Sequence, residues 1–178
     1  MNGAALPEEL DYLGFIDYAI DRTQRELPEI DSDAMRLVLT LHRVTSALVY
    51  DLESSVHRPR GFSWAGFRVL FVLWLAGPAE AKRVAELSGM SRAAVSALVN
   101  TLERAGLVSR RRADHDGRAI TLTLTSAGRA AITDAFRAHN QRERAWAATL
   151  TEAEHATLVG LLEKLMTGAN TATAKRRR

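Results

Sequence analysis

Residues 82–108, KRVAELSGMSRAAVSALVNTLERAGLV, restrict the fold of this 178-residue chain more than any other segment. Their apolar positions predict two short helices separated by a glycine, with Ser91 as the N-cap of the second helix. Ala85, Gly89 and Val95 have the spacing of a helix-turn-helix, in which a small residue lets the helices cross closely, glycine permits the turn and a branched side chain fills the angle. We therefore expect a helix-turn-helix in this segment.

Each of the two helices should bury one apolar face. The residues expected to face inward on the first helix are Val84, Ala85 and Leu87. Those on the second helix are Val95, Leu98, Val99 and Leu102. The remaining positions of the second helix must then be exposed, and they include residue types that reach base edges or phosphates in a DNA major groove: Arg92, Ala93, Ser96, Ala97 and Asn100. An ordinary solvated helix face is the competing interpretation.

The stretch RRRADHDGRAITLTLT, residues 110–125, predicts a β-hairpin directly after the second helix. A strand begins at Leu107 and Val108, DHDG supplies a turn, and apolar residues then alternate with threonine on the return strand. A hairpin that follows a recognition helix is a wing. We expect Arg118 at its tip to enter the minor groove, ordered by the carboxylate of Asp116.

The complete predicted DNA-binding set combines both helices and the hairpin, whose other arginines should lie near phosphates. It comprises Lys82, Arg83, Ser91, Arg92, Ala93, Ser96, Asn100, Arg110, Arg111, Arg112, Asp116 and Arg118. The charge distribution agrees, because residues 1–81 carry 12 acidic and 7 basic side chains whereas residues 82–118 carry 8 basic and 4 acidic ones. A basic block between neutral or acidic flanks marks the surface that a polyanion would approach.

Longer helices are predicted on both sides of this lobe. Residues 10–27 have apolar positions at helical spacing before Pro28, and residues 31–56 form a second helix with Asp31 or Ser32 as N-cap. A third helix, from Ser63 to the Gly-Pro pair at 77–78, is apolar all round and should lie in the middle of the fold. After the hairpin, a helix is expected from Ser126 to near Leu150, and the capping box TEAE at 151–154 opens a last helix with a leucine stripe. That stripe consists of Leu158, Leu161, Leu162 and Leu165.

The first and last helices have apolar stripes with no obvious partner inside a compact domain. Pairing two subunits would bury these stripes, and packing within one chain is the alternative. We therefore expect a mainly α fold with a small β-hairpin wing: a winged helix-turn-helix lobe at 63–126, and a dimerisation region of N-terminal helices at 1–62 and C-terminal helices at 127–170. Residues 171–178, which end in KRRR, are expected to form a disordered basic tail.

The wing sequence DGRAITLTLT resembles that of the MarR family of bacterial transcriptional regulators. GP, AELSGMS, VSALVNTLERAGLV and SAGR occur in the family's order and spacing, and the similarity extends from Trp64 to Arg129. The resemblance implies a homodimer whose two recognition helices bind a pseudo-palindromic operator. Ala97 stands where an arginine is often found and Ala94 where a serine or threonine is frequent, which shifts the expected base contacts toward Arg92, Ser96, Asn100 and the wing.

Family resemblance further implies a repressor released by a small, often aromatic anion held between the dimer helices and the DNA-binding lobe. Trp64, Phe67 and Trp74 could wall an aromatic ligand. Its carboxylate could pair with His42, Arg43 or Arg68. The competing interpretation is that the tryptophans belong to the core and the histidine to the surface. Arg68 follows Phe67 where the urate-responsive branch has an aspartate, so urate is not expected.

Other functional classes find little support in the sequence. The absence of cysteine excludes disulfides and thiolate metal sites. No nucleophile elbow, phosphate loop or dinucleotide fingerprint is present, so we expect neither an enzyme nor a cofactor. His139 and Glu143 lie four residues apart on a predicted helix and are interpreted as a solvated pair rather than a metal site.

No window reaches eighteen apolar residues, and the acidic start differs from a signal peptide, so we expect a cytoplasmic protein without a membrane partner. The alternative to a ligand-released repressor is a ligand-independent or nonspecific, architectural DNA-binding protein, which would show steep salt dependence and little preference for an operator.

Overall fold

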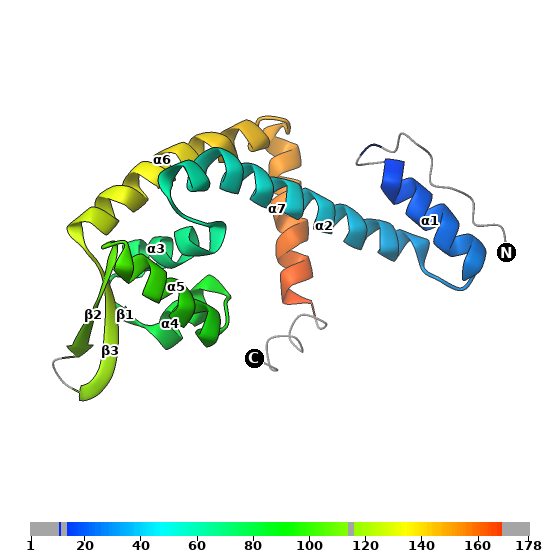
Figure 1. Ribbon diagram of the computed structural model, residues 1–178. Helices are drawn as coiled ribbons and strands as arrows, with labels where there is room; N and C mark the ends of the chain where they lie inside the picture. Colours follow the sequence, from blue (N-terminus) through cyan, green and yellow to red (C-terminus); the bar gives the residue numbers. More distant parts are fainter. Residues whose placement is uncertain (1–10, 12–13, 114–115, 169–178) are drawn as a thin grey trace. The chain divides into compact units, whose positions relative to one another are not determined.

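The structure is a computed structural model that describes Asp11, residues 14–113 and residues 116–168, the side chains of residues 112–119 excepted. The chain divides into two compact units, residues 1–51 and 52–178. The first unit contains α1 (Gly14–Glu26) and all of α2 (Ser32–Leu52) except its last residue. The second contains η1 (Glu53–His57), η2 (Arg58–Arg60), α3 (Trp64–Ala76), β1 (Ala79–Glu80), α4 (Ala81–Ser88), α5 (Arg92–Arg104), β2 (Val108–Ala113), β3 (Asp116–Leu124), α6 (Ser126–Ala147) and α7 (Glu152–Thr167), as Figure 1 shows.

In the first unit, α1 packs against α2. Ile16 and Ile20 of α1 are buried, as their spacing predicted. Arg36 donates to Asp17 at 2.5 Å, and this ion pair joins the two helices. The carboxylate of Asp31 accepts from the backbone N–H of Ala34 at 2.9 Å, which confirms Asp31 as the cap of α2.

The helix predicted over 31–56 ends earlier than expected. α2 stops at Leu52, and the chain continues through the π-helical turn η1 and the short 3₁₀ turn η2. Pro59 lacks a backbone N–H and therefore cannot continue the α-helical ladder. Gly61 then adopts a φ of 80°, a left-handed conformation that ends the segment before α3.

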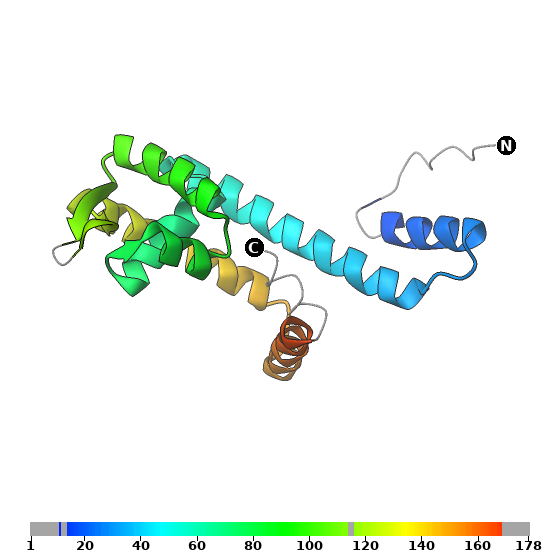
Figure 2. The same ribbon diagram turned by 90° about the horizontal axis from the view of Figure 1, so that it is seen from below.

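The third helix, α3, is the centre of the second unit, as its all-round apolar sequence predicted. It contacts α4, α5, α6 and β3, an arrangement visible in Figures 1 and 2. Ser63 caps it by accepting from the N–H of Gly66 at 3.0 Å. The fully buried side chains of the surrounding core include Leu70, Leu73, Val84, Val95, Val99, Leu122 and Ile132.

The predicted helix-turn-helix is present as α4 and α5. Gly89 has a φ of 65°, and Ser91 caps α5 by accepting from the N–H of Ala94 at 3.2 Å. The expected buried face of α5 is confirmed, with Leu98 only partly buried. The expectation for Leu87 was wrong, since 46% of it is exposed. Ser88, one helical turn beyond the buried Val84, completes the inward face of α4 instead.

The sheet has one strand more than the sequence predicted. The order is β1-β3-β2 and both pairings are antiparallel, with β1 pairing to Thr121 and Leu122 of β3. A strand of two residues is too short to show an alternating pattern, which is why the sequence revealed only the β2–β3 hairpin. β1 joins the segment after α3 to the wing.

The register of the hairpin separates its arginines. Arg110 lies opposite the buried Leu122, whereas Arg111 lies opposite Thr121. Directly opposed residues share a face and successive residues alternate, so Arg110 starts from the core face of the sheet and Arg111 from the other face.

The start of α6 is fitted closely against the loop that follows α5. Thr125 accepts from the N–H of Gly128 at 2.9 Å and donates to the carbonyl of Gly106 at 2.7 Å. A Cβ added at Gly128 would lie 1.9 Å from the carbonyl oxygen of Leu107. The helix predicted over 126–150 begins as expected but ends at Ala147, and the capping box of Thr151 and Glu154 opens α7 as predicted.

Gly128→Ala should destabilise the protein by about 1–3 kcal/mol or more, because the clash is with backbone that cannot rotate away. Gly160→Ala is the matched control, since Gly160 lies in a helix and a Cβ added there would meet nothing within 4 Å. At that position, alanine should raise the free energy of unfolding by roughly 0.5–1 kcal/mol. Urea unfolding at a fixed protein concentration measures both, and equal effects of the two substitutions would contradict the close fit at Gly128.

Candidate nucleic-acid interface

The outward face of α5 carries the residues expected to meet DNA. The buried side chains of Val95, Val99 and Leu102 hold the opposite face of the helix in the core. The exposed residues of α5 include Arg92, Ala93, Ser96, Ala97 and Asn100. The structure therefore brings these predicted residues together on one accessible helix face.

Two further predicted residues, Lys82 and Arg83, are exposed on α4. Arg83 lies 3.3 Å from Glu86, with 60% and 50% of the side chains exposed. An exposed ion pair of this kind contributes little energy, so it leaves the guanidinium able to reach a phosphate. Ser91 is also exposed, but its oxygen already accepts the N–H of Ala94 as the cap of α5.

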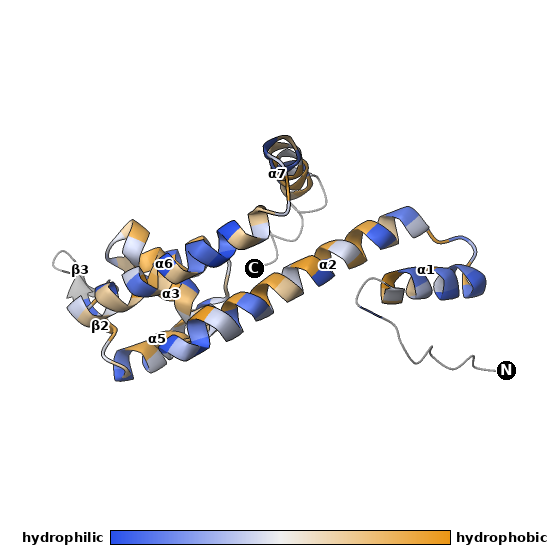
Figure 3. Cartoon of the chain, turned by 90° about the horizontal axis from the view of Figure 1, so that it is seen from above, coloured by the Kyte–Doolittle hydropathy of each residue, from blue (hydrophilic) through white to orange (hydrophobic). Residues whose placement is uncertain are grey.

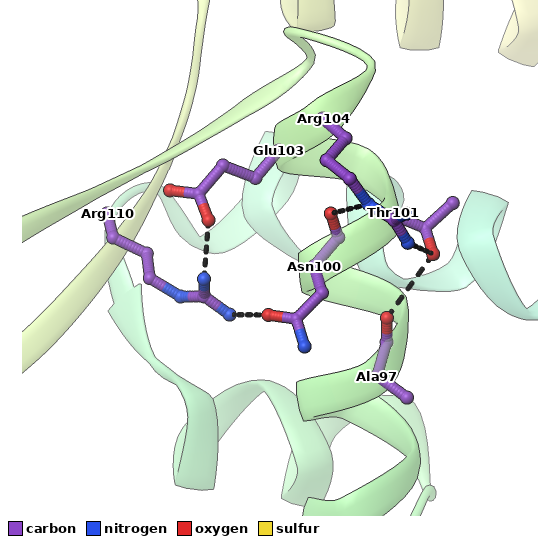
Figure 4. Close-up of polar contacts among 6 residues, drawn as sticks. All are labelled: Ala97, Asn100, Thr101, Glu103, Arg104 and Arg110. Atoms are coloured by element: carbon purple, nitrogen blue, oxygen red, sulfur yellow. Dashed lines mark hydrogen bonds and ion pairs between the residues drawn. The ribbon is translucent and has the colours of Figure 1, made fainter.

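The hairpin residues have different surroundings. Arg110 forms an ion pair with Glu103 and donates from Nη2 to Oδ1 of Asn100 at 2.5 Å (Figure 4). Arg111 is exposed on the other face of the strand. The side chains of three predicted residues, Arg112, Asp116 and Arg118, lie outside the described residues, so the ordering role expected for Asp116 stays a prediction.

A group of stacked aromatic side chains lies where η1, α3 and α6 meet. His57 stacks on Phe67 with 4.3 Å between ring centroids and on Trp64 with 5.4 Å. His139 of α6 stacks on Phe67 at 4.7 Å. Phe71, Trp74 and Phe136 extend this aromatic cluster.

The two histidines of the aromatic cluster form a buried polar chain that ends at a carboxylate. His57 is 0% and His139 5% exposed. Nε2 of His57 lies 3.2 Å from Nδ1 of His139, and Nε2 of His139 lies 3.0 Å from Oε1 of Glu143. Because a carboxylate only accepts, Nε2 of His139 donates to it, and Nδ1 of a neutral His139 then accepts from His57. The expected pair of His139 and Glu143 therefore exists, but the interpretation of it as solvated was wrong for His139.

This chain leaves Nδ1 of His57 buried with no hydrogen-bond partner among the described residues. A proton added there would have no acceptor in that part of the protein. Burial, and next the neighbouring His139, lower the pKa of His57 from 6.5 to about 4, an effect opposed by Glu53 and reinforced by Arg60. His57 is therefore neutral in the folded protein near neutral pH.

Sequence reasoning missed His57 because ESSVHRPR around it shows no apolar periodicity. The other residues predicted to bind a ligand are His42, Arg43 and Arg68. Nη2 of Arg68 lies 3.4 Å from the position of a Cβ at Gly89, beside the turn of the helix-turn-helix. His42 and Arg43 belong to the first unit, where Arg43 lies over the ring of Phe15 at 4.7 Å.

Among the residues that the structure describes, no helix combines the length and apolar content needed to cross a membrane. Nor do these residues include a group of three or more histidine, aspartate or glutamate side chains placed to hold a metal ion.

His57 should make the stability of the protein depend on pH. The unfolded state takes up a proton below pH 6.5 and the folded state only below about 4, so the free energy of unfolding should rise with pH across that interval, by up to about 3 kcal/mol. This contribution is complete above pH 6.5 and is lost as the pH falls through the folded-state pKa. Urea titrations at several pH values measure it.

His57→Gln should remove this pH dependence, since an amide can still donate to His139 but does not titrate. His155→Gln, at an exposed site on α7, is the control, and this variant should keep the pH dependence of the free energy of unfolding. A wild-type slope that survives in His57→Gln would show that another group is responsible.

Comparison with known proteins shows where this chain has relatives. Residues 60–119 match the model of the MarR family. YwaE, an uncharacterised HTH-type transcriptional regulator of Bacillus subtilis (strain 168), is 28% identical over 148 residues, which cover 83% of this chain and 86% of YwaE. The matched family region contains the helix-turn-helix and reaches to the end of the wing tip.

Two solved structures share the fold. A mutant of MarR from E. coli in complex with operator DNA is similar with a TM-score of 0.69 and 21% identity, over 81% of this chain and 97% of that one. BpsR of Bordetella bronchiseptica, whose DNA binding is regulated by 6-hydroxynicotinic acid, is similar with a TM-score of 0.67 and 23% identity, over 73% of this chain and 98% of BpsR.

Proposed function

We propose that this chain, a MarR-family transcriptional regulator with a winged helix-turn-helix, is a repressor. It binds a pseudo-palindromic DNA operator as a homodimer and is released from it by a small aromatic anion. The observation that carries the proposal is the exposed face of α5, where Arg92, Ser96 and Asn100 project from a helix whose other face is locked into the core. Arginine, serine and asparagine at such positions can contact base edges and phosphates in a major groove. We assign no catalytic residue.

The proposed homodimer accounts for apolar surface that the single chain leaves exposed. Every residue of α7 is exposed, although the helix is rich in leucine. The large apolar residues exposed on α2 and α7 are Leu37, Val38, Val44, Tyr50, Leu158, Val159, Leu161, Leu162, Leu165 and Met166, and Figure 3 shows how hydrophobic residues recur along α2. Because a lone short helix is marginally stable in water, α7 needs a covering partner, which we propose is the second subunit.

Support for a ligand-responsive repressor comes from chemistry and from similarity. Trp64 of the aromatic cluster is partly exposed, and its ring suits stacking with a planar ligand, whereas Phe67 is buried against the rings of His57 and His139. BpsR, which has a similar fold, is a protein whose DNA binding is regulated by 6-hydroxynicotinic acid. We propose Trp64 as a residue that contacts the ligand. Phe67 as a further contact, and His42, Arg43 and Arg68 as partners of the anionic group, stay predictions. Release then requires that the ligand bind more tightly to a dimer whose recognition helices do not fit the operator.

The decisive experiment is a titration of the full-length protein against the DNA upstream of its own gene and against random duplex, with and without aromatic carboxylic acids, at several salt concentrations. A specific regulator should prefer the upstream DNA by about 10³-fold or more, and an effector should reduce that preference. Equal affinity for both duplexes, with a steep salt slope, would instead identify a nonspecific architectural protein.

Arg118→Ala should weaken operator binding by roughly 1–3 kcal/mol if the wing tip enters the minor groove. Removal of the KRRR tail at 175–178 is the comparison. It should change nonspecific binding and its salt slope more than operator preference. Abolition of operator recognition by the tail deletion would place the interface elsewhere.

Leu161→Lys should shift the protein from dimer to monomer, because a charge would have to be buried in the proposed subunit interface. Glu163→Lys, a charge change on the same exposed helix, should leave the dimer intact. Sedimentation equilibrium measures both. A dimer that tolerates Leu161→Lys would show that α7 does not form the interface.

A further inference from the structure

The guanidinium of Arg110 bridges the wing and α5, although Arg110 itself is an exposed residue. It forms an ion pair with Glu103 through Nη1 and a hydrogen bond of 2.5 Å to Oδ1 of Asn100 through Nη2. Figure 4 shows Glu103 and Asn100 reaching toward it from one side of α5. About a third of each ion-pair side chain is exposed, 32% for Arg110 and 37% for Glu103. The two residues are therefore occupied with each other in the free protein.

This contact determines which atoms Asn100 can offer to DNA. A guanidinium has only donors, so the atom of the Asn100 amide that faces it must be the oxygen. The amide nitrogen then points away from Arg110, as Figure 4 shows. Arg104 lies on another side, donating to the backbone carbonyl of Asn100 at 3.2 Å, and does not hold the amide. Asn100 is exposed, so its –NH₂ group is accessible.

We propose that Arg110 and Glu103 are positioning residues that hold Asn100 with its –NH₂ toward the DNA, so that this position of α5 selects guanine. Free asparagine commonly pairs with adenine by donating to N7 and accepting from N6. With its oxygen turned to Arg110, Asn100 offers donors alone. Guanine has two adjacent major-groove acceptors, N7 and O6, whereas adenine places the N6 donor beside N7.

The same arrangement explains why an acidic residue is tolerated on a DNA-binding helix. An unpaired carboxylate at Glu103 would repel phosphates. Arg110 neutralises it. The inference rests on the proposed function, because it requires α5 to lie in a major groove.

The test is selection of bound sequences from a randomised duplex library, followed by affinity measurements on each single-base variant of the selected operator. The full-length wild type is compared with Asn100→Ala, Glu103→Gln and the double variant Arg110→Met/Glu103→Gln, which removes the guanidinium without leaving an unpaired carboxylate. Arg111→Met is the matched control, since Arg111 is exposed on the opposite face of the same strand.

Wild type should prefer guanine to adenine by about fivefold or more at one base pair in each half-site. Asn100→Ala and the double variant should both lose the preference at that same base pair. Glu103→Gln should keep it, because the amide oxygen of glutamine can still accept from Arg110 and hold it in place. Arg111→Met should instead weaken binding to all sequences evenly and reduce the salt slope by about one.

Three results would overturn the inference while leaving operator binding intact. The first is an even loss of affinity with a reduced salt slope in the double variant. The others are a wild-type preference for adenine at the base pair that depends on Asn100, or the absence of any base pair whose recognition depends on Asn100. Failure of the wild type to select any sequence would contradict the proposed function itself. Circular dichroism monitors folding. Should the double variant not fold, Arg110→Lys is the second variant, and it should lower the guanine preference because an ammonium lacks the planar fork that holds both partners.

Discussion

The function of this chain depends on one packing interaction, the burial of a single face of α5 against the apolar helix α3. Val95 and Val99 enter a core that α3 shares with α4, α6 and the sheet. Because that face cannot leave the core without a large loss of buried apolar surface, the opposite face is always presented to solvent in the same orientation. The DNA recognition that we propose needs this constancy, since a base contact depends on atomic placement.

Polar interactions then orient side chains on the exposed face of α5. Arg110 comes from the core face of the wing and meets Glu103 and Asn100 at the surface of α5, so the sheet and the recognition helix are joined by charge as well as by apolar contact. Inside the second unit, His57 and His139 are polar side chains buried in the aromatic cluster. Their mutual hydrogen bond and the carboxylate of Glu143 place two polar rings in an aromatic cluster at the cost of one unsatisfied nitrogen.

Some large apolar side chains stay exposed in the single chain, whereas most of the buried polar atoms described above have hydrogen-bond partners. Leucines of α7 and several large side chains of α2 remain exposed in the single chain, whereas the helix-turn-helix core is closed. Closed packing suits the part of the molecule that must stay rigid on DNA. The open stripes lie on the flanking helices, and a second subunit is the partner that we propose for them.

Local features were predictable from the sequence because interactions within a few residues determine them. The caps at Ser63, Ser91 and Thr151, the helix-turn-helix and the hairpin all belong to this class. Only the tertiary structure revealed the two-residue strand β1 and the exposure of Leu87, since neither follows from periodicity in a short segment.

The most informative contacts join residues that are distant in the chain. His57 meets His139 across 82 positions, the carbonyl of Leu107 explains Gly128, and Arg110 turns to α5 instead of outward. The sequence by itself determined the elements and the winged helix-turn-helix class, because helix caps, turns and apolar periods act locally. The fold alone decided which polar side chains face each other, because those encounters depend on how whole elements pack.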